Sequence, residues 1–264
     1  MIKLIRKFYK RTKNLQVISY PKSGRTWLTV MVGEYLKRVF DLKIDDIMDI
    51  HNYSQSLDNL PSIHFGHDDQ PLWKKPYELK MDKSKFKNDK VILLIREPKD
   101  VLVSAYFERT KRYPKYRPDL PMFEGSISKY IRQDVGGIDT IIEFNNNWYN
   151  NKSVPSDFRY YRYEDLIQNT HEVLSNILMF IGIEQIDETI LHEVVVATEF
   201  KNMQKQEGKM LFKSVYLQPG DMTDQESYKV RKGKIGGYID YLNEEDIIFL
   251  DSRIKNSMNP IFGY

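Results

Sequence analysis

One short segment, residues 16–27, constrains the fold most, because it joins a strand to a helix through a tight turn. An apolar run from Val17 to Tyr20 stops at Pro21, and the apolar spacing of a helix begins near Arg25. A helix N-terminus presents unpaired N–H groups and a partial positive charge, so such a turn can bind an anion. Taken alone, such a turn is more often an ordinary connection with a solvated lysine.

The turn also contains the residue types that an anion site needs. Gly24 lets the backbone approach a ligand closely, and Lys22 adds a positive charge. Ser23 and Thr26 add hydroxyl donors. Residues 21–26 are therefore predicted to hold an anionic group.

A second apolar run, Val91–Ile95, ends at Arg96 and precedes Pro98, which suits the first turn of a helix. Strands that alternate with helices predict a parallel sheet covered on both faces, with ligands at the carboxyl ends of the strands. Both apolar runs are followed by basic residues, so an anion site is expected there. We also expect helices at 126–134, 137–150, 164–181, 187–197 and from an Asn243 cap to about 255, and a strand at 158–163.

Two segments do not fit regular elements. The helix after Pro98 is expected to end at Lys111, because residues 112–121 contain three prolines and cannot continue it. Residues 198–235 are polar and rich in glycine and lysine, and no helix or strand is predicted within them.

Composition and charge exclude several functions. The chain has no cysteine, so disulfides, thiolate nucleophiles and cysteine metal sites are ruled out. Residues 1–14 contain six of the 40 Lys and Arg and no acid, so the rest is slightly acidic and does not suit a broad nucleic-acid-binding face. No transmembrane-length run or signal-peptide pattern is present, and a cytoplasmic location is expected. We divide the chain into a basic N-terminal segment, residues 1–14, and a single domain, residues 15–264. We favour a frayed, solvated helix for the N-terminal segment, with weak contact to a membrane as the alternative.

Five segments resemble, in the same order, motifs of the sulfotransferases that use 3′-phosphoadenosine 5′-phosphosulfate (PAPS). Residues 21–27 resemble the loop P-K-S-G-T-T-W, and residues 96–104 resemble R-x-P-x-D-x-x-x-S. Residues 163–166 are similar to Y-E-D-L, residues 198–203 to T-x-F-x-x-M, and residues 231–236 to R-K-G-x-x-G. The resemblance implies an α/β, three-layer, P-loop-like fold with a central parallel sheet flanked by helices. It also implies PAPS as the donor, its desulfated form PAP as the product, and no metal.

The resemblance assigns roles to these segments. Lys22 is expected to be catalytic and to stabilise the bridging oxygen as the 5′-phosphate leaves. The nucleotide is expected to contact the loop residues Lys22, Ser23, Gly24, Arg25 and Thr26, the adenine-site residues Trp27, Tyr163, Thr198 and Phe200, and the 3′-phosphate ligands Arg96, Ser104, Arg231, Lys232 and Gly233.

A base must take the proton of the acceptor hydroxyl, and histidine suits that task at neutral pH. The family's histidine follows a strand between the first helix and the 3′-phosphate strand, where this chain has His64 and His67. We favour His67 as the catalytic base, because it begins a polar stretch and His67-Asp68 resembles the bacterial members. Two alternatives stay open, namely His64 and a base that is neither of these histidines.

The chain departs from the family pattern in three places. Arg25 replaces the first threonine of T-T-W and adds a cation near the sulfuryl group. Gly237 and Tyr238 stand where many members have Asp-Trp, and the dimerisation signature of the animal members is not recognisable, so the oligomeric state is not predicted. The acceptor is expected to be a small molecule, lipid or glycan with a hydroxyl or amine group, bound by the aromatic loops 64–78, 105–137 and 205–230.

Two other functions are considered. A P-loop kinase would have the sequence G-x-x-x-x-G-K-[ST], but here Lys22 precedes Gly24, and no acidic residue ends an obvious strand as a Mg²⁺ ligand. A non-catalytic nucleotide-binding protein would keep the fold without the chemistry. The presence of Lys22 together with His67 argues against that second function.

Overall fold

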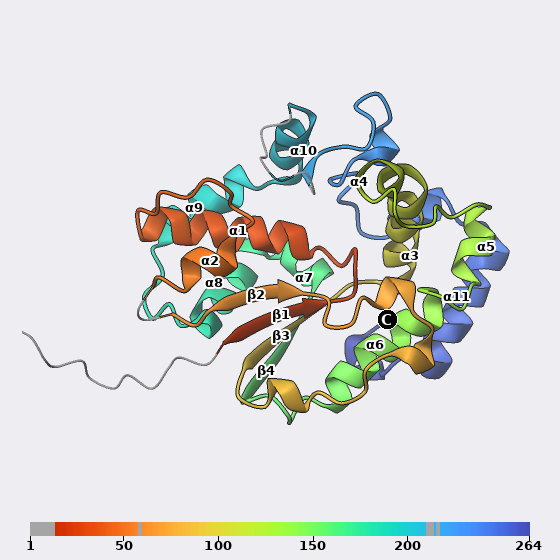
Figure 1. The fold of residues 1–264 in the computed structure, drawn as a ribbon, viewed down its shortest axis with the longest axis horizontal. Helices are drawn as coiled ribbons and strands as arrows, with labels where there is room; N and C mark the ends of the chain where they lie inside the picture. The colour runs from red at the N-terminus through yellow and green to blue at the C-terminus, as the bar shows by residue number, and fades with distance from the viewer. Residues whose placement is uncertain (1–13, 58–59, 210–213, 215–216) are drawn as a thin grey trace, which may run out of the picture.

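The computed structural model describes residues 14–57, 60–209, 214 and 217–264 (Figure 1). Its centre is a four-stranded sheet in the order β2-β1-β3-β4, in which all neighbouring strands are parallel. The strands are β1 (Leu15–Ser19), β2 (Ile63–Gly66), β3 (Lys90–Ile95) and β4 (Asp157–Arg162). The predicted α/β fold with a central parallel sheet is therefore confirmed. Residues 1–13 of the predicted basic segment lie outside the described residues.

Helices cover both faces of the sheet, because successive strand residues point to opposite sides. In β3, Ile92 and Leu94 pack on one face, whereas Val91 and Leu93 pack on the other. The first face carries α1 (Arg25–Val39), α2 (Ile50–Ser54), α7 (Tyr163–Gln168), α8 (Thr170–Ile181) and α9 (Glu188–Ala197). The second carries α3 (Pro98–Phe107), α5 (Ile127–Ile131), α6 (Ile138–Asn150) and α11 (Glu244–Ser257).

Most elements agree with the sequence predictions, including the last helix. The Asn243 side chain accepts a hydrogen bond from the Asp246 backbone N–H at 2.8 Å and so caps α11. The helix expected at 164–181 is divided into α7 and α8 at Asn169, whose backbone is not helical. Short 3₁₀ turns lie at Pro71–Trp73, Pro76–Glu78, Ser84–Phe86, Gln225–Ser227, Gly237–Asp240 and Pro260–Phe262.

Two predictions on helices were wrong. The helix that begins at Pro98 does not end at Lys111, because α3 continues through a π-helical turn (Glu108–Arg112) into α4 (Tyr113–Tyr116). Pro114 lies in the first turn of α4, where its missing N–H costs little. The polar segment 198–235 contains α10 (Phe200–Gly208).

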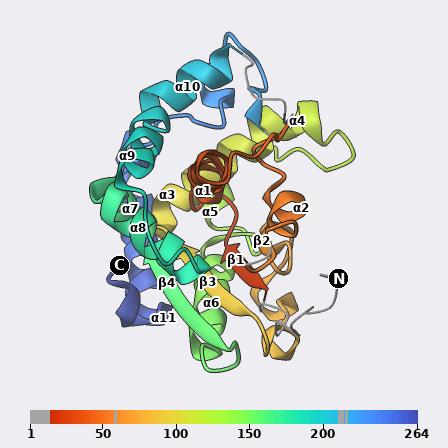
Figure 2. The ribbon, with the colours of Figure 1, turned by 90° about the vertical axis from the view of Figure 1, so that its left-hand side faces the viewer.

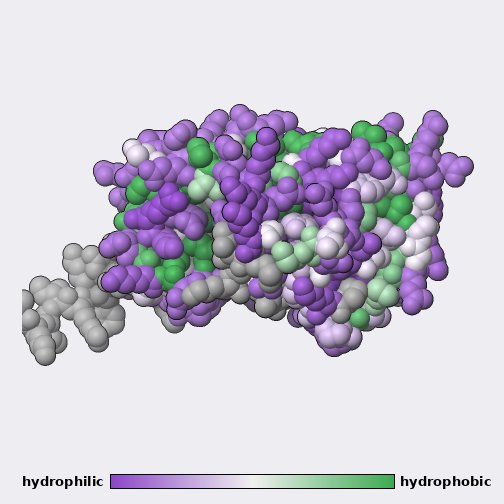
Figure 3. All heavy atoms as spheres, turned by 90° about the horizontal axis from the view of Figure 1, so that it is seen from above, coloured by the Kyte–Doolittle hydropathy of each residue, from purple (hydrophilic) through white to green (hydrophobic). Residues whose placement is uncertain are grey.

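The helices α4 and α10 lie above the start of α1 in two perpendicular views (Figures 1 and 2). Seen from above, this face of the molecule is largely hydrophilic, with scattered apolar patches (Figure 3). Within the described part of the chain, every helix is too short or too polar to cross a membrane.

Candidate active site

A cavity of about 540 Å³ opens at the carboxyl ends of β1 and β3. It is lined by residues of the turn before α1, of the helix α3, of α7 and α10, and of the segment 229–237. Thirteen of the fifteen predicted site residues line it: Lys22, Gly24, Arg25, Thr26, Trp27, His67, Arg96, Ser104, Tyr163, Phe200, Arg231, Lys232 and Gly233. The other two, Ser23 and Thr198, are buried beside it and do not line it.

Two glycines allow backbone to lie directly against aromatic rings. Gly24 has a φ of 92° and Gly233 a φ of 58°, a left-handed region that favours glycine. A Cβ atom at Gly24 would overlap the Tyr163 ring, and one at Gly233 would overlap the Phe200 ring. The turn and the segment 229–237 are therefore held close to Tyr163 and Phe200, two of the three aromatic residues that were predicted to surround adenine.

The indole of Trp27 is fixed by its neighbours. Its Nε1–H donates to the Thr198 carbonyl at 2.8 Å, and its ring meets the Tyr163 ring edge to face at 6.0 Å between centroids. The Thr198 hydroxyl donates to the Val194 carbonyl at 2.7 Å, inside its own helix end. In this structure Thr198 thus orients Trp27 through its backbone.

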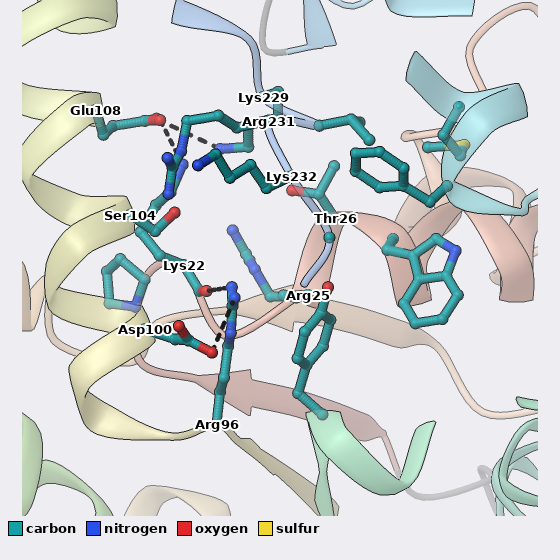
Figure 4. Close-up of a pocket in the computed structure, with 18 of the residues that line it drawn as sticks. Lys22, Arg25, Thr26, Arg96, Asp100, Ser104, Glu108, Lys229, Arg231 and Lys232 are labelled. Carbon is teal, nitrogen blue, oxygen red and sulfur yellow. Dashed lines mark hydrogen bonds and ion pairs between the residues drawn. The ribbon is translucent and has the colours of Figure 1, made fainter. Parts of the chain in front are cut away.

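Arg96 lies at the end of β3 and faces several groups at once (Figure 4). Its Nη1 donates to the Lys22 carbonyl at 3.1 Å, and its Nη2 lies 3.6 Å from Asp100. The guanidinium carbon lies 4.4 Å from the centroid of the Tyr163 ring. Its Nε is buried and has no hydrogen-bond partner among the described residues, so this donor is available for a bound anion. Ser104 lines the cavity two helical turns further along α3.

Asp100 connects residues 236–238 to α3, a role that we did not predict. Its carboxylate accepts the backbone N–H groups of Gly236 and Tyr238, both at 2.9 Å. Arg231 and Lys232 pair with Glu226 at 2.8 Å and Asp240 at 3.0 Å, respectively. The only signal in the sequence was that Asp100 belongs to the R-x-P-x-D motif.

Glu108, also not predicted, is the centre of a buried charge cluster (Figure 4). Its carboxylate lies 2.5 Å from Lys22 Nζ, 3.2 Å from Arg112 Nε and 3.4 Å from Lys229 Nζ. Burial alone would raise the pKa of Glu108, but these three cations hold it well below its ordinary value. Burial lowers the pKa of Lys22 to about 7, although Glu108 acts in the opposite direction. Glu108 lies one turn after Ser104 on the same helical face, which is the signal that could have found it.

A second buried carboxylate, Glu207 in α10, holds the backbone next to this cluster. It accepts the N–H groups of Lys229 at 2.5 Å and Val230 at 2.7 Å, and it lies 3.5 Å from Arg112. This interaction positions the segment that leads to Arg231. No pattern in the sequence indicated Glu207, because the backbone groups of Lys229 and Val230 that it binds lie more than twenty positions further along a polar segment.

The structure brings only one of the two candidate histidines to the cavity. His67 lines it, with Nδ1 2.8 Å from the Ser19 carbonyl and Nε2 2.9 Å from Arg25 Nη2. Burial, together with Arg25, lowers the pKa of His67 to about 3, so its ring is neutral at neutral pH. His64 does not line the cavity; its ring packs on His51 at 4.0 Å between centroids.

No group of three or more histidine, aspartate or glutamate side chains has the arrangement of a metal site in the described part of the chain. The charged groups of the cavity are instead lysine and arginine side chains with carboxylate partners. Such a site is suited to binding a nucleotide with several anionic groups.

Comparison with known proteins agrees with this geometry. A family model described as the sulfotransferase domain matches residues 12–261. Cytosolic sulfotransferase 12 of Arabidopsis thaliana is 25% identical over 95% of this chain and 78% of its own length. The 3-beta-hydroxysteroid sulfotransferase of Cavia porcellus is 25% identical over 88% of this chain and 79% of its own length.

Solved structures show the same fold. The mouse sulfotransferase SULT7A1 complexed with PAP superposes with a TM-score of 0.62, at 22% identity over 94% of this chain and 86% of its own. Retinol dehydratase in a complex with retinol and PAP gives a TM-score of 0.64, at 15% identity over 94% of this chain and 81% of its own. Because the family model covers nearly the whole chain, the predicted family is confirmed: this protein is an enzyme of the sulfotransferase family.

Proposed function

We propose that the cavity transfers the sulfuryl group of PAPS to a hydroxyl group of a small-molecule acceptor. The observation that carries the proposal is that charged groups from distant segments meet in one cavity. Cations from the turn before α1, from the end of β3 and from the segment 229–237 meet in one cavity with an aromatic wall and a neutral histidine. PAPS has the matching features, which are an adenine ring, two separate phosphate positions and a transferable anionic group.

The nucleotide-binding half of the cavity fits this donor. Trp27 and Phe200 would hold the adenine ring between them, with Tyr163 at its edge. The buried, unsatisfied Nε of Arg96 is a donor that a 3′-phosphate would satisfy, together with Ser104 and Arg231. Lys232 and the Gly233 N–H would close over the same phosphate. The N-terminus of α1, with Thr26 and Ser23, would hold the 5′-phosphate.

The chemistry requires one proton transfer and one charge to be stabilised. PAPS supplies the sulfuryl group, whose bond to the 5′-phosphate oxygen breaks as a bond to the acceptor oxygen forms. His67 would take the proton of the acceptor hydroxyl at Nε2, since Nδ1 donates to the Ser19 carbonyl. Lys22 would stabilise the negative charge on the departing oxygen, and Glu108 keeps this buried lysine protonated more readily than burial alone would allow.

The acceptor side is apolar and aromatic. Trp73 and Tyr113 stack at 5.6 Å between centroids and line the cavity with Leu72. The guanidinium of Arg109 lies over the Trp73 ring, 4.4 Å from its centroid, and so helps to fix that ring. A flat or apolar alcohol or phenol would suit this wall, and the Cavia porcellus relative is named for a hydroxysteroid. A cytoplasmic location goes with the proposal, because the plant relative is named a cytosolic sulfotransferase.

The test is transfer of ³⁵S from labelled PAPS to a panel of alcohols, phenols, amines, glycans and lipids. We expect turnover with at least one apolar alcohol or phenol, and loss of turnover in Lys22→Ala. Tight binding of PAP by the purified chain, without transfer to any acceptor, would favour the non-catalytic alternative. Failure to bind PAP, with ATP and Mg²⁺ bound instead, would favour the kinase.

A further inference from the structure

The imidazole of His67 is held at both nitrogens. The Ser19 carbonyl can only accept a hydrogen bond, so Nδ1, at 2.8 Å, carries the proton. The guanidinium of Arg25 can only donate, so Nε2, at 2.9 Å from Nη2, is the acceptor. The two contacts together select one tautomer and direct Nε2 to Arg25, and both side chains line the cavity.

Arg25 differs from the other basic residues of the cavity. Among the residues that the structure describes, eight lysine and arginine side chains line it: Lys22, Arg25, Arg96, Arg117, Lys229, Arg231, Lys232 and Lys234. Seven of them form an ion pair with a carboxylate. Arg25 forms none with any residue that the structure describes, and its guanidinium has the ring of His67 as its side-chain partner. Its positive charge is therefore not neutralised within the described protein and faces the space where an anion would bind.

A neutral imidazole has one lone pair in the plane of the ring. While Arg25 donates to it, Nε2 cannot accept the proton of a hydroxyl group. The same contact opposes protonation of His67 by solvent, since it places a cation 2.9 Å from the nitrogen that would be protonated. The base is thus kept neutral and oriented, but it becomes usable only when Arg25 moves away.

We propose that Arg25 is a positioning residue that holds His67 in the tautomer with the proton on Nδ1 and the lone pair on Nε2. When the anionic sulfuryl group of the donor attracts the guanidinium, Arg25 moves away and releases Nε2. The inference rests on the proposed function and deepens it. The proton of the acceptor hydroxyl then goes to Nε2, as its oxygen forms the new bond to sulfur. His67 would therefore act as a base only after the donor is in place, which limits proton transfer to the loaded site.

The first test follows His67 itself, by ¹⁵N–¹H spectra of the histidine side chains of the whole chain as a function of pH. The charged groups around the ring are Arg25 on α1, Lys229 in the segment 229–237 and Glu108 in the π-helical turn after α3. We expect His67 to stay neutral to below pH 5. Arg25→Gln keeps an N–H donor but removes the charge, and its His67 should protonate at a pH at least about one unit higher. Arg25→Lys, which keeps the charge, should titrate closer to the parent.

Lys234→Gln is the matched control, because it removes one positive charge from the rim of the same cavity, where Lys234 pairs with Asp240. Its His67 should titrate as in the parent protein. Equal titration of His67 in the parent and in Arg25→Gln would overturn the proposal.

The second test compares the His67 spectra of the protein with PAP and with PAPS, after calorimetry has established that each nucleotide binds. PAPS, but not PAP, should move the Nε2 resonance of His67 towards that of a free lone pair. Identical spectra with both nucleotides would overturn the proposed release. The titration of the protein alone needs no turnover, so a chain that transfers no sulfuryl group would refute the proposed function without touching the result for Arg25.

Discussion

Replacing Glu108 with glutamine should disturb both the stability and the pH dependence of this enzyme. The substitution keeps the shape of the side chain but removes the negative charge that faces Lys22, Arg112 and Lys229. Removing one partner of a buried ion pair typically costs about 3–5 kcal/mol, because the remaining charges stay buried without compensation. Each kcal/mol lowers the melting temperature by roughly 2–4 °C in a chain of this size. A loss of about 10 °C is therefore expected.

The same change should make Lys22 harder to protonate. Two opposite unit charges about 4 Å apart attract by about 4 kcal/mol at an effective dielectric constant near 20, which corresponds to about three pKa units. Glu108 raises the pKa of Lys22, so its loss lowers that pKa further from about 7. If Lys22 must be protonated, kcat/KM for PAPS should fall as pH rises through about 7 in the parent enzyme. In Glu108→Gln the fall should begin at least about two pH units lower.

The assay combines thermal unfolding with a pH profile of kcat/KM. Asp240→Asn is the matched control, since Asp240 also pairs with two cavity lysines, Lys232 and Lys234, but is exposed. Its effect on stability should stay within about 1 kcal/mol. The double variant Glu108→Gln/Lys229→Met should recover part of the lost stability, because it removes one uncompensated cation. If Glu108→Gln melts with the parent and keeps its pH profile, the cluster does not control Lys22.

The remaining predictions concern the base, the 3′-phosphate and the metal. His67→Ala should keep near-normal affinity for PAP but lose at least about a hundredfold in kcat. His64 lies outside the cavity, so His64→Ala should lose much less activity. An inactive His64→Ala together with an active His67→Ala would reverse the assignment of the base. Arg96→Ala should weaken PAP binding roughly ten- to hundredfold, as expected for a charge-assisted contact of about 1.5–3 kcal/mol. Adenosine 5′-phosphosulfate, which lacks the 3′-phosphate, should be affected far less, and equal losses measured by calorimetry would refute this role. PAP binding should be the same with EDTA and with Mg²⁺, and a requirement for Mg²⁺ would support the kinase instead.

The elements that carry the anion site could be predicted from the sequence because their signals are local. The apolar run before Pro21 and the helical spacing after Gly24 lie within one short segment, and β1 and α1 form there. Val91–Ile95 has no polar residue because both faces of β3 are covered by helices. Since parallel strands place their carboxyl ends together, the sequence alone predicts that Lys22 and Arg96 lie at one edge of the sheet.

The ion pairs of the site could not be predicted in the same way. Glu108 meets Lys22 across 86 positions and Lys229 across 121, and a sequence gives no register between such distant segments. The sequence predicted that Arg25 would place a positive charge near the sulfuryl group, but it did not predict that Arg25 contacts His67. That contact depends on how β2 pairs with β1, where Ile18 lies opposite Gly66, just before His67. The helix was wrongly predicted to end before the proline-rich stretch, because a π-helical turn allows the chain to begin a new helical turn at Tyr113.

The arrangement of charges in the cavity follows from the cost of gathering cations. Several lysine and arginine side chains in a buried space repel one another and lose hydration, so they would destabilise the fold if none were neutralised. Asp100 on α3, the helix that presents Ser104 to the cavity, and Glu108 in the π-helical turn that follows it both reduce this cost. An incoming nucleotide must then compete with these carboxylates, so its affinity reflects the difference between phosphate and carboxylate contacts. Arg25 is exempt from that competition, and for this reason its charge is the one that responds most directly to the group being transferred.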